Sequence, residues 1–437
     1  MGKPLLITVG LLFMLFSLTM MNMRNREAMV SERLVSYYTE QHAMNIANSV
    51  AEHARRHIMA NSDNNVDIPA TDYMGTEVTL HVVNLGMFEK RITATSHYEN
   101  KIAEAVIEMY RLPISEYAYF TNRETSDGGA PIWFHSADIL YGPVHTNGTF
   151  NFMGTPTFEG RISSPNSPDY ASGADPDFRQ GSYFGADYEN NSDQIPTIEY
   201  DNISDLRGAA ALSSLKFEGN IELEFLGEDG IKIVRSDGEE DVRSLEELYT
   251  SEGDQVVISS DGEITIKGEV KGQYTVYSEK DIKIVGDVKY HDHPEDPSDE
   301  VEHENVLGIA SESDVIVCKD AHTVNDGSDL HIHASIIALG NSFYVEDYAE
   351  GSQRGTLHLV GGLIQETRGA VGTMQSRTNR WGQTTTTYTG FDKDYQYDDR
   401  LGDNRIAPPF FPRAESYTTR SWLTTVREAP PISEPPL

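Results

Sequence analysis

The stretch ITIKGEVK, residues 264–271, is followed eighteen positions later by IKIVGDVK, residues 282–289. The two segments align without gaps, and Gly268 falls on Gly286. A strand, a glycine corner and a second short strand that recur at a fixed interval are typical of a β-solenoid. In such a coil, inward Ile and Val side chains stack on those of the next turn. We therefore expect the two glycines to occupy equivalent backbone positions.

A second repeat lies further along the chain. LHIHASIIA, residues 330–338, matches LHLVGGLIQ, residues 357–365, at a spacing of 27. Together the repeats predict a mainly β fold, with a right-handed β-helix or solenoid-like domain. The alternative is a β-sandwich whose hairpins resemble one another. Glycines at fixed offsets favour the solenoid, because a sandwich hairpin does not require them there.

The stretch YGPVHTNGTF, residues 141–150, combines turn signals with isolated apolar positions. The same pattern continues after it, so we interpret the stretch as the first turn of the solenoid-like domain. Asn147 and Gly148 are expected to supply the positive φ angles of its corner. His145 lacks a readable nucleophile or carboxylate partner, so we assign it a structural role and predict no catalytic residue.

The N-terminus differs from the rest of the chain. Residues 4–23 carry no charge and are long enough to cross a bilayer as a helix. A cleaved signal peptide is the alternative, but the apolar run is long and no small-x-small site follows it. Apolar residues then recur at steps of three and four, without Pro or Gly, as far as Ala60. We expect one long transmembrane and amphipathic α-helix, or two nearly collinear helices.

These patterns divide the chain into four parts. Residues 1–60 form the membrane anchor and helix, and residues 61–130 a small hairpin or α/β region. Residues 131–412 form the solenoid-like domain, with inserted loops at about 163–196 and 291–304, and residues 413–437 a C-terminal tail. The loops are expected because both segments are rich in polar residues, Gly or Pro.

The segment SERLVSYYTEQHAMNIANSVAEHA, residues 31–54, resembles the N-terminal region of PilX-type minor pilins. Motifs such as GPVHTNG and LHLVGGLIQETRGAVGT resemble an uncharacterised bacterial family that joins a pilin-like helix to a repetitive β domain of unknown function. The resemblance implies a membrane-tethered envelope protein and carries no catalytic residues over. It departs from type IV prepilins near the start, where Lys3 and Pro4 follow Gly2 and Ile7 replaces the usual Glu.

Three histidines are the candidates for a metal site. His331 and His333 share one face of a predicted strand, and His358 falls on His331 in the 27-residue repeat. Imidazole suits zinc, copper or nickel, but no fourth ligand is readable. We therefore interpret them as surface histidines and expect no metal and no cofactor. The acidic segment 291–304 is expected to be a solvated loop with at most weak affinity for divalent cations.

Charge and composition exclude some classes of function. Asp and Glu total 69 against 34 Lys and Arg, a net charge of -35, which disfavours nucleic-acid binding. The single cysteine, Cys318, excludes an intrachain disulfide. We expect a single-pass inner-membrane protein, not an enzyme, whose β domain is exported to the periplasm or cell surface. Its partners would be the membrane, other pilin-like or envelope proteins and a surface ligand, in assembly or adhesion. The alternative is a membrane-tethered β-helix enzyme acting on polysaccharide.

Overall fold

A computed structural model describes residues 2–430, apart from 61–67, 87–88, 127, 137, 186–202, 250–255, 295–302, 325–328, 379, 382–383 and 403–405. The chain divides into two units. Unit 1 comprises residues 1–112 and 415–437, and unit 2 comprises residues 113–414. The fold is mainly β with a long N-terminal helix, as predicted.

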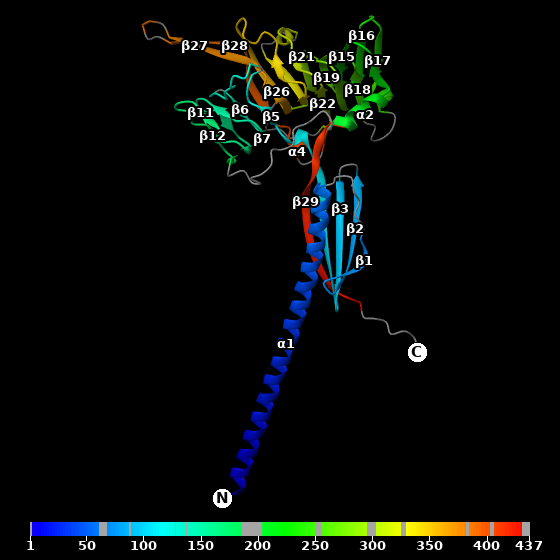
Figure 1. The fold of residues 1–437 in the computed structure, drawn as a ribbon, viewed down its shortest axis with the longest axis vertical. Coiled ribbons are helices and arrows are strands. Elements are labelled where there is room, and N and C mark those ends of the chain that lie inside the picture. Colours follow the sequence, from blue (N-terminus) through cyan, green and yellow to red (C-terminus); the bar gives the residue numbers. More distant parts are fainter. Residues whose placement is uncertain are drawn as a thin grey trace. The chain divides into compact units, whose positions relative to one another are not determined.

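Unit 1 is a helix packed on an antiparallel sheet (Figure 1). The sheet has the strand order β1-β2-β3-β4-β29. The hairpin expected within residues 61–130 is confirmed as β2 and β3, and the next strand, β4, pairs with β3. The elements are α1 (Gly2–Ala60), β1 (Ile68–Tyr73), β2 (Thr76–Gly86), β3 (Glu89–Tyr98), β4 (Lys101–Pro113) and β29 (Arg413–Glu428).

Helix α1 is continuous, as predicted, because no proline or glycine interrupts it after Gly10. Its C-terminal part packs on the sheet through small side chains: Ala43, Ala47, Ala51 and Ala54 are buried. Their spacing of three and four places them on one face of the helix. Alanines of β3 and β4 face them in the same core, so helix and sheet approach closely.

The N-terminal part of α1 contains the predicted membrane span. Side chains of α1 are described from Gly10 onward, and residues 4–9 of the predicted span lie outside that set. Among the described residues, no helix combines the length and apolarity that a membrane crossing needs.

Unit 2 is built from short strands. Its first segment contains η1 (Ile114–Glu116), β5 (Tyr119–Arg123), β6 (Ile139–Leu140), β7 (Val144–Thr146), β8 (Asn151–Phe152), β9 (Thr157–Phe158), β10 (Ile162–Ser164), β11 (Asp169–Tyr170), β12 (Asp177–Phe178) and β13 (Ser182–Phe184). Its second segment contains α2 (Ser204–Leu212), β14 (Leu215–Phe217), β15 (Ile221–Leu226), η4 (Gly227–Asp229), β16 (Ile231–Arg235), β17 (Glu240–Arg243), α3 (Leu245–Leu248), β18 (Val256–Ser260), β19 (Ile264–Val270), β20 (Gln273–Ser278), β21 (Ile282–Tyr290), β22 (Val306–Ser311), β23 (Val315–Val317), η5 (Ala321–Thr323), β24 (Leu330–Ala338), β25 (Phe343–Val345), β26 (Gln353–Thr367), β27 (Gly372–Thr378), β28 (Thr384–Gln396) and α4 (Asp399–Gly402).

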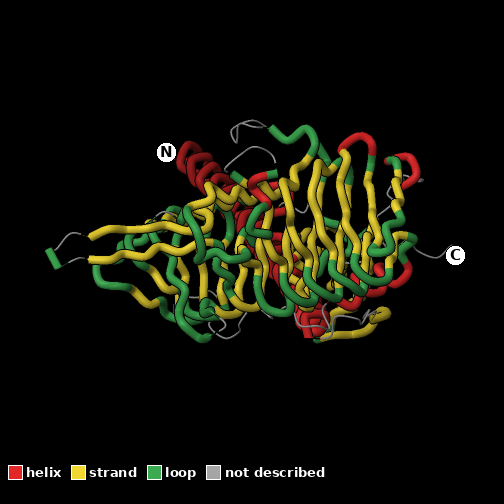
Figure 2. The backbone as a smooth tube through the Cα atoms, turned by 90° about the horizontal axis from the view of Figure 1, so that it is seen from above, coloured by secondary structure: helices red, strands yellow, loops and turns green. Residues whose placement is uncertain are grey.

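Most of these strands pair in parallel ladders, visible in Figure 2 as successive rows of strands. One ladder runs β13, β10, β7, β5, β26, β24, β22, β20, β18, β14. A second runs β12, β9, β6, β28, β26, β24, β21, β19, β15. Strands β5 and β6, the first in unit 2, pair with β26 and β28 in the middle of the ladders. The strands that follow extend the ladders to β13 and β12 at one end. The chain then forms β14 and β15 at the opposite end and continues back toward β26 and β28.

The core of unit 2 lies between the ladders. Ile264, Ile266, Ile282 and Ile284 are fully buried in it, in register between β19 and β21. Each such side chain contributes about 1.5–3 kcal/mol of apolar burial. The alternation of buried and partly exposed residues in these strands places the polar residues outward. This outward face holds the candidate site.

The 27-residue repeat is confirmed residue by residue, because Leu330 to Ala338 pair in register with Leu357 to Gln365. The expectation for the 18-residue repeat is wrong in its second half. A bulge after Ile266 shifts the register by two, so Gly268 pairs with Val288 and not with Gly286. Gly268 has a φ of +111°, and a Cβ there would lie 2.1 Å from the Phe225 carbonyl oxygen. The crowding from the neighbouring strand explains the glycine.

Two further expectations about unit 2 are corrected. Residues 163–184 do not form a plain loop, because β11, β12 and β13 lie within them and continue the parallel pairing. Only residues 186–196 of the expected loop lie outside the described residues. At the first turn, positive φ occurs at Gly142, +86°, and not at Asn147 or Gly148. A Cβ on Gly142 would contact the Tyr397 side chain at 2.5 Å.

The expected domain limits also change. Residues 113–130 belong to unit 2 and start its ladders with β5, instead of joining the hairpin region. The expected tail contains β29, which completes the sheet of unit 1 beside β4. Some three hundred residues separate these two strands in sequence. A pairing over that distance has no local signal.

Candidate functional site

A pocket of about 580 Å³ lies on the outward face of β21, β24, β26 and β28 in unit 2. It brings together the three histidines singled out from the sequence, His331, His333 and His358. The remaining lining residues are Glu269, Lys289, Tyr290, Asp292, His293, Pro294, Leu359, Val360, Asp394 and Gln396. A concave site with a few converging polar groups is the usual form of a small-molecule pocket.

The ladder places one polar row across three strands. His331 on β24 pairs with His358 on β26, which pairs with Asp394 on β28. The imidazoles of the two histidines stack, with centroids 4.6 Å apart and planes 11° apart. Nδ1 of His358 lies 2.8 Å from Oδ2 of Asp394, so the carboxylate fixes the orientation of the ring. Burial, and next the His358 ring, lower the pKa of His331.

His333 forms the deeper wall. It is buried, and the backbone N–H of Tyr290 donates to its Nδ1 at 3.1 Å. The ring of His293 packs against it edge-on, with centroids 4.5 Å apart. Burial, and then the neighbouring His293, hold the pKa of His333 well below its usual range. At neutral pH the pocket is therefore walled by a neutral imidazole.

Arg400 is linked to this wall through hydrogen bonds to His303, which contacts His293. Arg400 binds Asp398 through two hydrogen bonds, of 2.9 Å from Nε and 2.6 Å from Nη2. Its Nη1 also donates to the carbonyl oxygen of His303 at 2.6 Å. His303 in turn lies 3.1 Å from Nδ1 of His293 through its Nε2. Burial, followed by the charge of Arg400, lowers the pKa of His303 to about 4.

The geometry does not favour a metal. Among the described residues, no group of three or more His, Cys, Asp or Glu side chains is arranged to hold an ion. The stacked rings of His331 and His358 are nearly parallel, so their ring nitrogens do not converge on one point. Nδ1 of His333 already accepts the Tyr290 N–H. Residues 295–302, in the acidic segment expected to bind cations weakly, lie outside the described residues.

Sequence reasoning missed part of this pocket. His293 was placed in a solvated loop, and Asp394 and Gln396 were not singled out. The repeat identified His331 and His358 because β24 and β26 have similar sequences. Residues 393–396 of β28 pair in register with residues 357–360 of β26, but the segment KDYQ shares no motif with LHLV.

His145 lies at a different place in unit 2, inside the first turn. It is fully buried, with Nδ1 2.9 Å from Oγ of Ser163 and Nε2 3.1 Å from Oδ1 of Asn147. Its ring stacks on Phe120, with centroids 5.5 Å apart. Burial lowers the pKa of His145 to about 4. These contacts fit the structural role assigned from the sequence.

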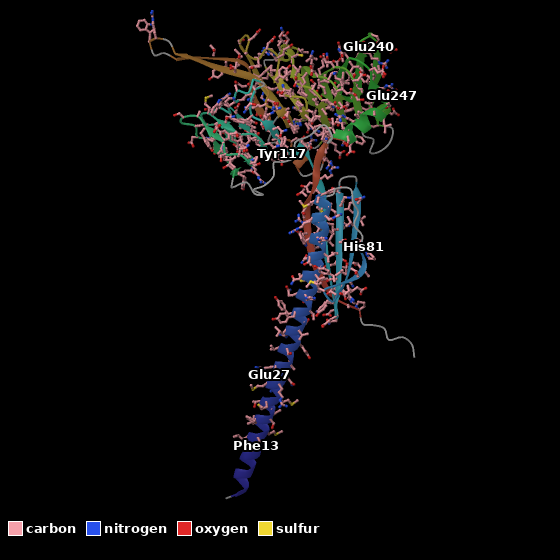
Figure 3. All side chains as sticks on the ribbon, in the orientation of Figure 1. Phe13, Glu27, His81, Tyr117, Glu240 and Glu247 are labelled. Carbon is pink, nitrogen blue, oxygen red and sulfur yellow. The ribbon has the colours of Figure 1, made fainter. Side chains whose placement is uncertain are left out.

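A second candidate surface lies on α1 in unit 1. The stretch that carries Phe13 and Glu27 extends beyond the sheet (Figure 3). Large apolar side chains from Leu11 to Tyr38 are exposed there; Phe13 and Leu15, for example, are 68% and 62% exposed. Burial begins at Thr39. The same helix therefore has an unpacked apolar part and a part packed on the sheet.

Comparison with known proteins yields little. The model of the family described as "Domain of unknown function (DUF4900)" matches residues 84–166, less than half of the chain. No curated protein sequence matches. A solved structure, the competence-associated pilin ComZ from Thermus thermophilus, aligns over 90% of this chain and 98% of its own at 11% identity. Its TM-score is 0.37, too low to carry an argument about fold or function.

Proposed function

We propose that this protein is a membrane-anchored, pilin-like subunit of the cell envelope, with a role in assembly or adhesion in a pilus-like or secretion-like system. The observation that carries the proposal is the change of environment along α1. Apolar side chains such as Leu11 and Phe13 have no partner in the described chain, whereas Ala43 and Ala47 are buried on the sheet.

The exposed apolar surface of α1 favours contact with an apolar partner. Removal of apolar surface from water stabilises by about 25 cal/mol per Å², and the exposed apolar side chains run from Leu11 to Met23. The uncharged stretch from residue 4 to residue 23, in which side chains are described from Gly10 onward, suits the interior of a bilayer. A bundle of similar helices would cover the exposed residues that follow, such as Val30 and Val35.

For unit 2 we propose a β-solenoid whose successive turns stack through the parallel ladders. Support comes from the in-register apolar columns, such as Ile264 over Ile282 and Leu330 over Leu357. A solenoid leaves long polar faces on its outside, which suits a surface that meets other molecules. An experimental structure in which the two ladders belonged to separate sandwich sheets would contradict this.

Anchoring can be tested by deletion. We expect full-length protein in the envelope fraction, and a variant lacking residues 1–25 in the soluble fraction with its sheet intact. Far-UV circular dichroism and protease resistance check that the variant is folded. A folded variant that still sediments with membranes would refute the anchor.

Assembly can be tested by crosslinking in cells. A photoreactive residue at Val35, on the exposed part of α1, is expected to crosslink to other pilin-like or envelope proteins. The matched control carries the same residue at Val242 on β17, which is equally exposed at 55% against 56% for Val35. Equal crosslinking patterns at the two positions would contradict a helix-mediated assembly. The expectation that the protein is not an enzyme stays a prediction.

A further inference from the structure

The pocket of unit 2 balances hydrogen-bond donors and acceptors. His331 and His333 have lowered pKa values, so at neutral pH each ring carries one N–H donor and one acceptor nitrogen. The Gln396 amide nitrogen donates to Oδ2 of Asp394 at 3.2 Å, which leaves the Gln396 carbonyl oxygen and the second N–H for a ligand, and Asp394 adds further acceptor capacity. A ligand suited to this lining must itself donate and accept at closely spaced positions.

The charges of the pocket disfavour an anionic ligand. Among its described lining residues, Lys289 is the one permanent cation, and its Nζ is 3.1 Å from Oδ2 of Asp287. An anion would also meet Glu269, Asp292 and Asp394. The carboxylates are themselves engaged: Asp394 holds His358 at 2.8 Å, and Oε1 of Glu269 lies 2.8 Å from Nδ1 of His291. The carboxylates keep their charge, but Oδ2 of Asp394 and Oε1 of Glu269 are already hydrogen-bonded, so a cation would compete with these contacts.

The pocket also offers flat and apolar surface. The stacked rings of His331 and His358 line the pocket, and Leu359, Val360 and Pro294 contribute carbon atoms. A sugar ring has the matching character, because its C–H groups form an apolar face and its hydroxyls lie at the edge. Each hydroxyl donates one hydrogen bond and accepts others. The volume of about 580 Å³ lies within the ordinary range of ligand pockets.

We propose that this pocket binds a neutral carbohydrate. The sugar ring packs against the stacked rings of His331 and His358, and its hydroxyls form hydrogen bonds with His333, Asp394 and Gln396. The row of His331, His358 and Asp394 positions the site, because three neighbouring strands fix it in register. This role is separate from that of α1, since every residue involved lies in unit 2. Binding of a glycan would give the exposed β domain a target.

The experiment is calorimetric titration of the full-length protein in detergent micelles. The probes are neutral di- and trisaccharides of glucose, galactose and N-acetylglucosamine. Digalacturonic acid and chitosan dimer serve as the anionic and cationic counterparts. We expect saturable binding of at least one neutral sugar, at least tenfold tighter than either charged dimer. Tighter binding of a charged dimer, or no saturable binding of any neutral sugar, would overturn the proposal.

Matched variants locate the site. Gln396→Ala and His331→Ala are each expected to weaken binding at least tenfold. Gln353→Ala is the control, because Gln353 also contacts a carboxylate, that of Asp392, but lies outside the pocket. Its affinity is expected to equal that of the wild type. Thermal melting checks that each variant is folded, and a folded pair of pocket variants that bind as the control does would refute the assignment.

Discussion

His331 and His358 occupy paired positions on β24 and β26, and their imidazole rings stack at 4.6 Å. They lie 27 positions apart, which is one repeat of the chain, so their contact reflects the register of β24 and β26. A slip by one residue would turn both rings toward the core, because side chains alternate between the faces of a strand. The pocket therefore depends on the buried side chains that hold these strands in place.

Close approach between β24 and β26 can be tested at Gly361. Its φ is +140°, and a Cβ would lie 2.1 Å from the carbonyl oxygen of Ala334. Gly361→Ala is expected to lower the free energy of unfolding of unit 2 by about 2–4 kcal/mol, through backbone strain and overpacking. The measurement is urea denaturation. Gly208→Ala in helix α2 is the control, since its Cβ would meet nothing within 4 Å, and it should stabilise by about 0.5–1 kcal/mol.

Unit 2 contains a buried ion pair whose loss can be measured. Nη1 of Arg368 lies 3.0 Å from Oε2 of Glu124, and both side chains are almost fully buried. Arg368→Ala is expected to cost about 3–5 kcal/mol, because Glu124 is left charged and without its partner. The exposed pair of Arg179 and Asp177 provides the control, and Arg179→Ala should cost less than about 1 kcal/mol. Equal losses in denaturation experiments would contradict the prediction.

Acid should destabilise unit 2 through its buried histidines. The folded-state pKa values of His145 and His303 are lowered to about 4, chiefly by burial, from an unfolded value of about 6.5. The unfolded chain therefore binds protons first as the pH falls. The stability from each neutral imidazole is complete above pH ~6.5 and is lost progressively down to pH ~4.

Denaturation at pH 7.5 and pH 5 measures this effect. His145→Gln, which keeps hydrogen-bonding capacity beside Ser163 and Asn147, should reduce the pH dependence. The slope of the unfolding free energy against pH should fall by up to about 1.4 kcal/mol per pH unit, which corresponds to the uptake of one proton. If His145→Gln kept the wild-type slope, the lowered pKa of His145 would be wrong.

Packing of α1 on its sheet depends on small side chains. Ala51 is fully buried against the alanines of β3 and β4. Ala51→Leu is expected to destabilise unit 1 by about 1–3 kcal/mol, because the added carbons force helix and sheet apart. Ser49→Leu, two residues away on the exposed side, is the control and should change stability by less than about 0.5 kcal/mol. Hydrogen exchange of the β3 amides would report the difference.

Parts of the fold with a local signal were predicted from the sequence. The continuous helix α1 and the pairing of residues 330–338 with 357–365 were each indicated by a pattern in the sequence, and both are confirmed. The bulge after Ile266 was not predictable, because it belongs to the pairing of β19 with β21 and the two segments match without a gap in sequence. The short strands within residues 163–184 were missed since two or three residues carry no readable period.

In the candidate site too, residues with a local sequence signal were predicted and residues without one were missed. Its histidines on β24 and β26 were found through the repeat, whereas Asp394 and His293 reach the pocket only through strand pairing and the folding back of residues 291–294. Their placement depends on contacts between segments that have no sequence in common. Burial of His333 beneath His293 likewise could not be read from the alternation of its strand.

The placement of β29 beside β4 has a consequence for how the protein is made. A ribosome delivers β4 some three hundred residues before its neighbour, and β5 well before its ladder partner β26. Until the last strands emerge, both units expose unpaired strand edges, which are prone to aggregation. Truncated or prematurely released chains therefore expose these unpaired edges, whereas the edges are paired in complete chains. Proteases and chaperones that recognise open edges would thus discriminate finished copies from unfinished ones before any of them is used.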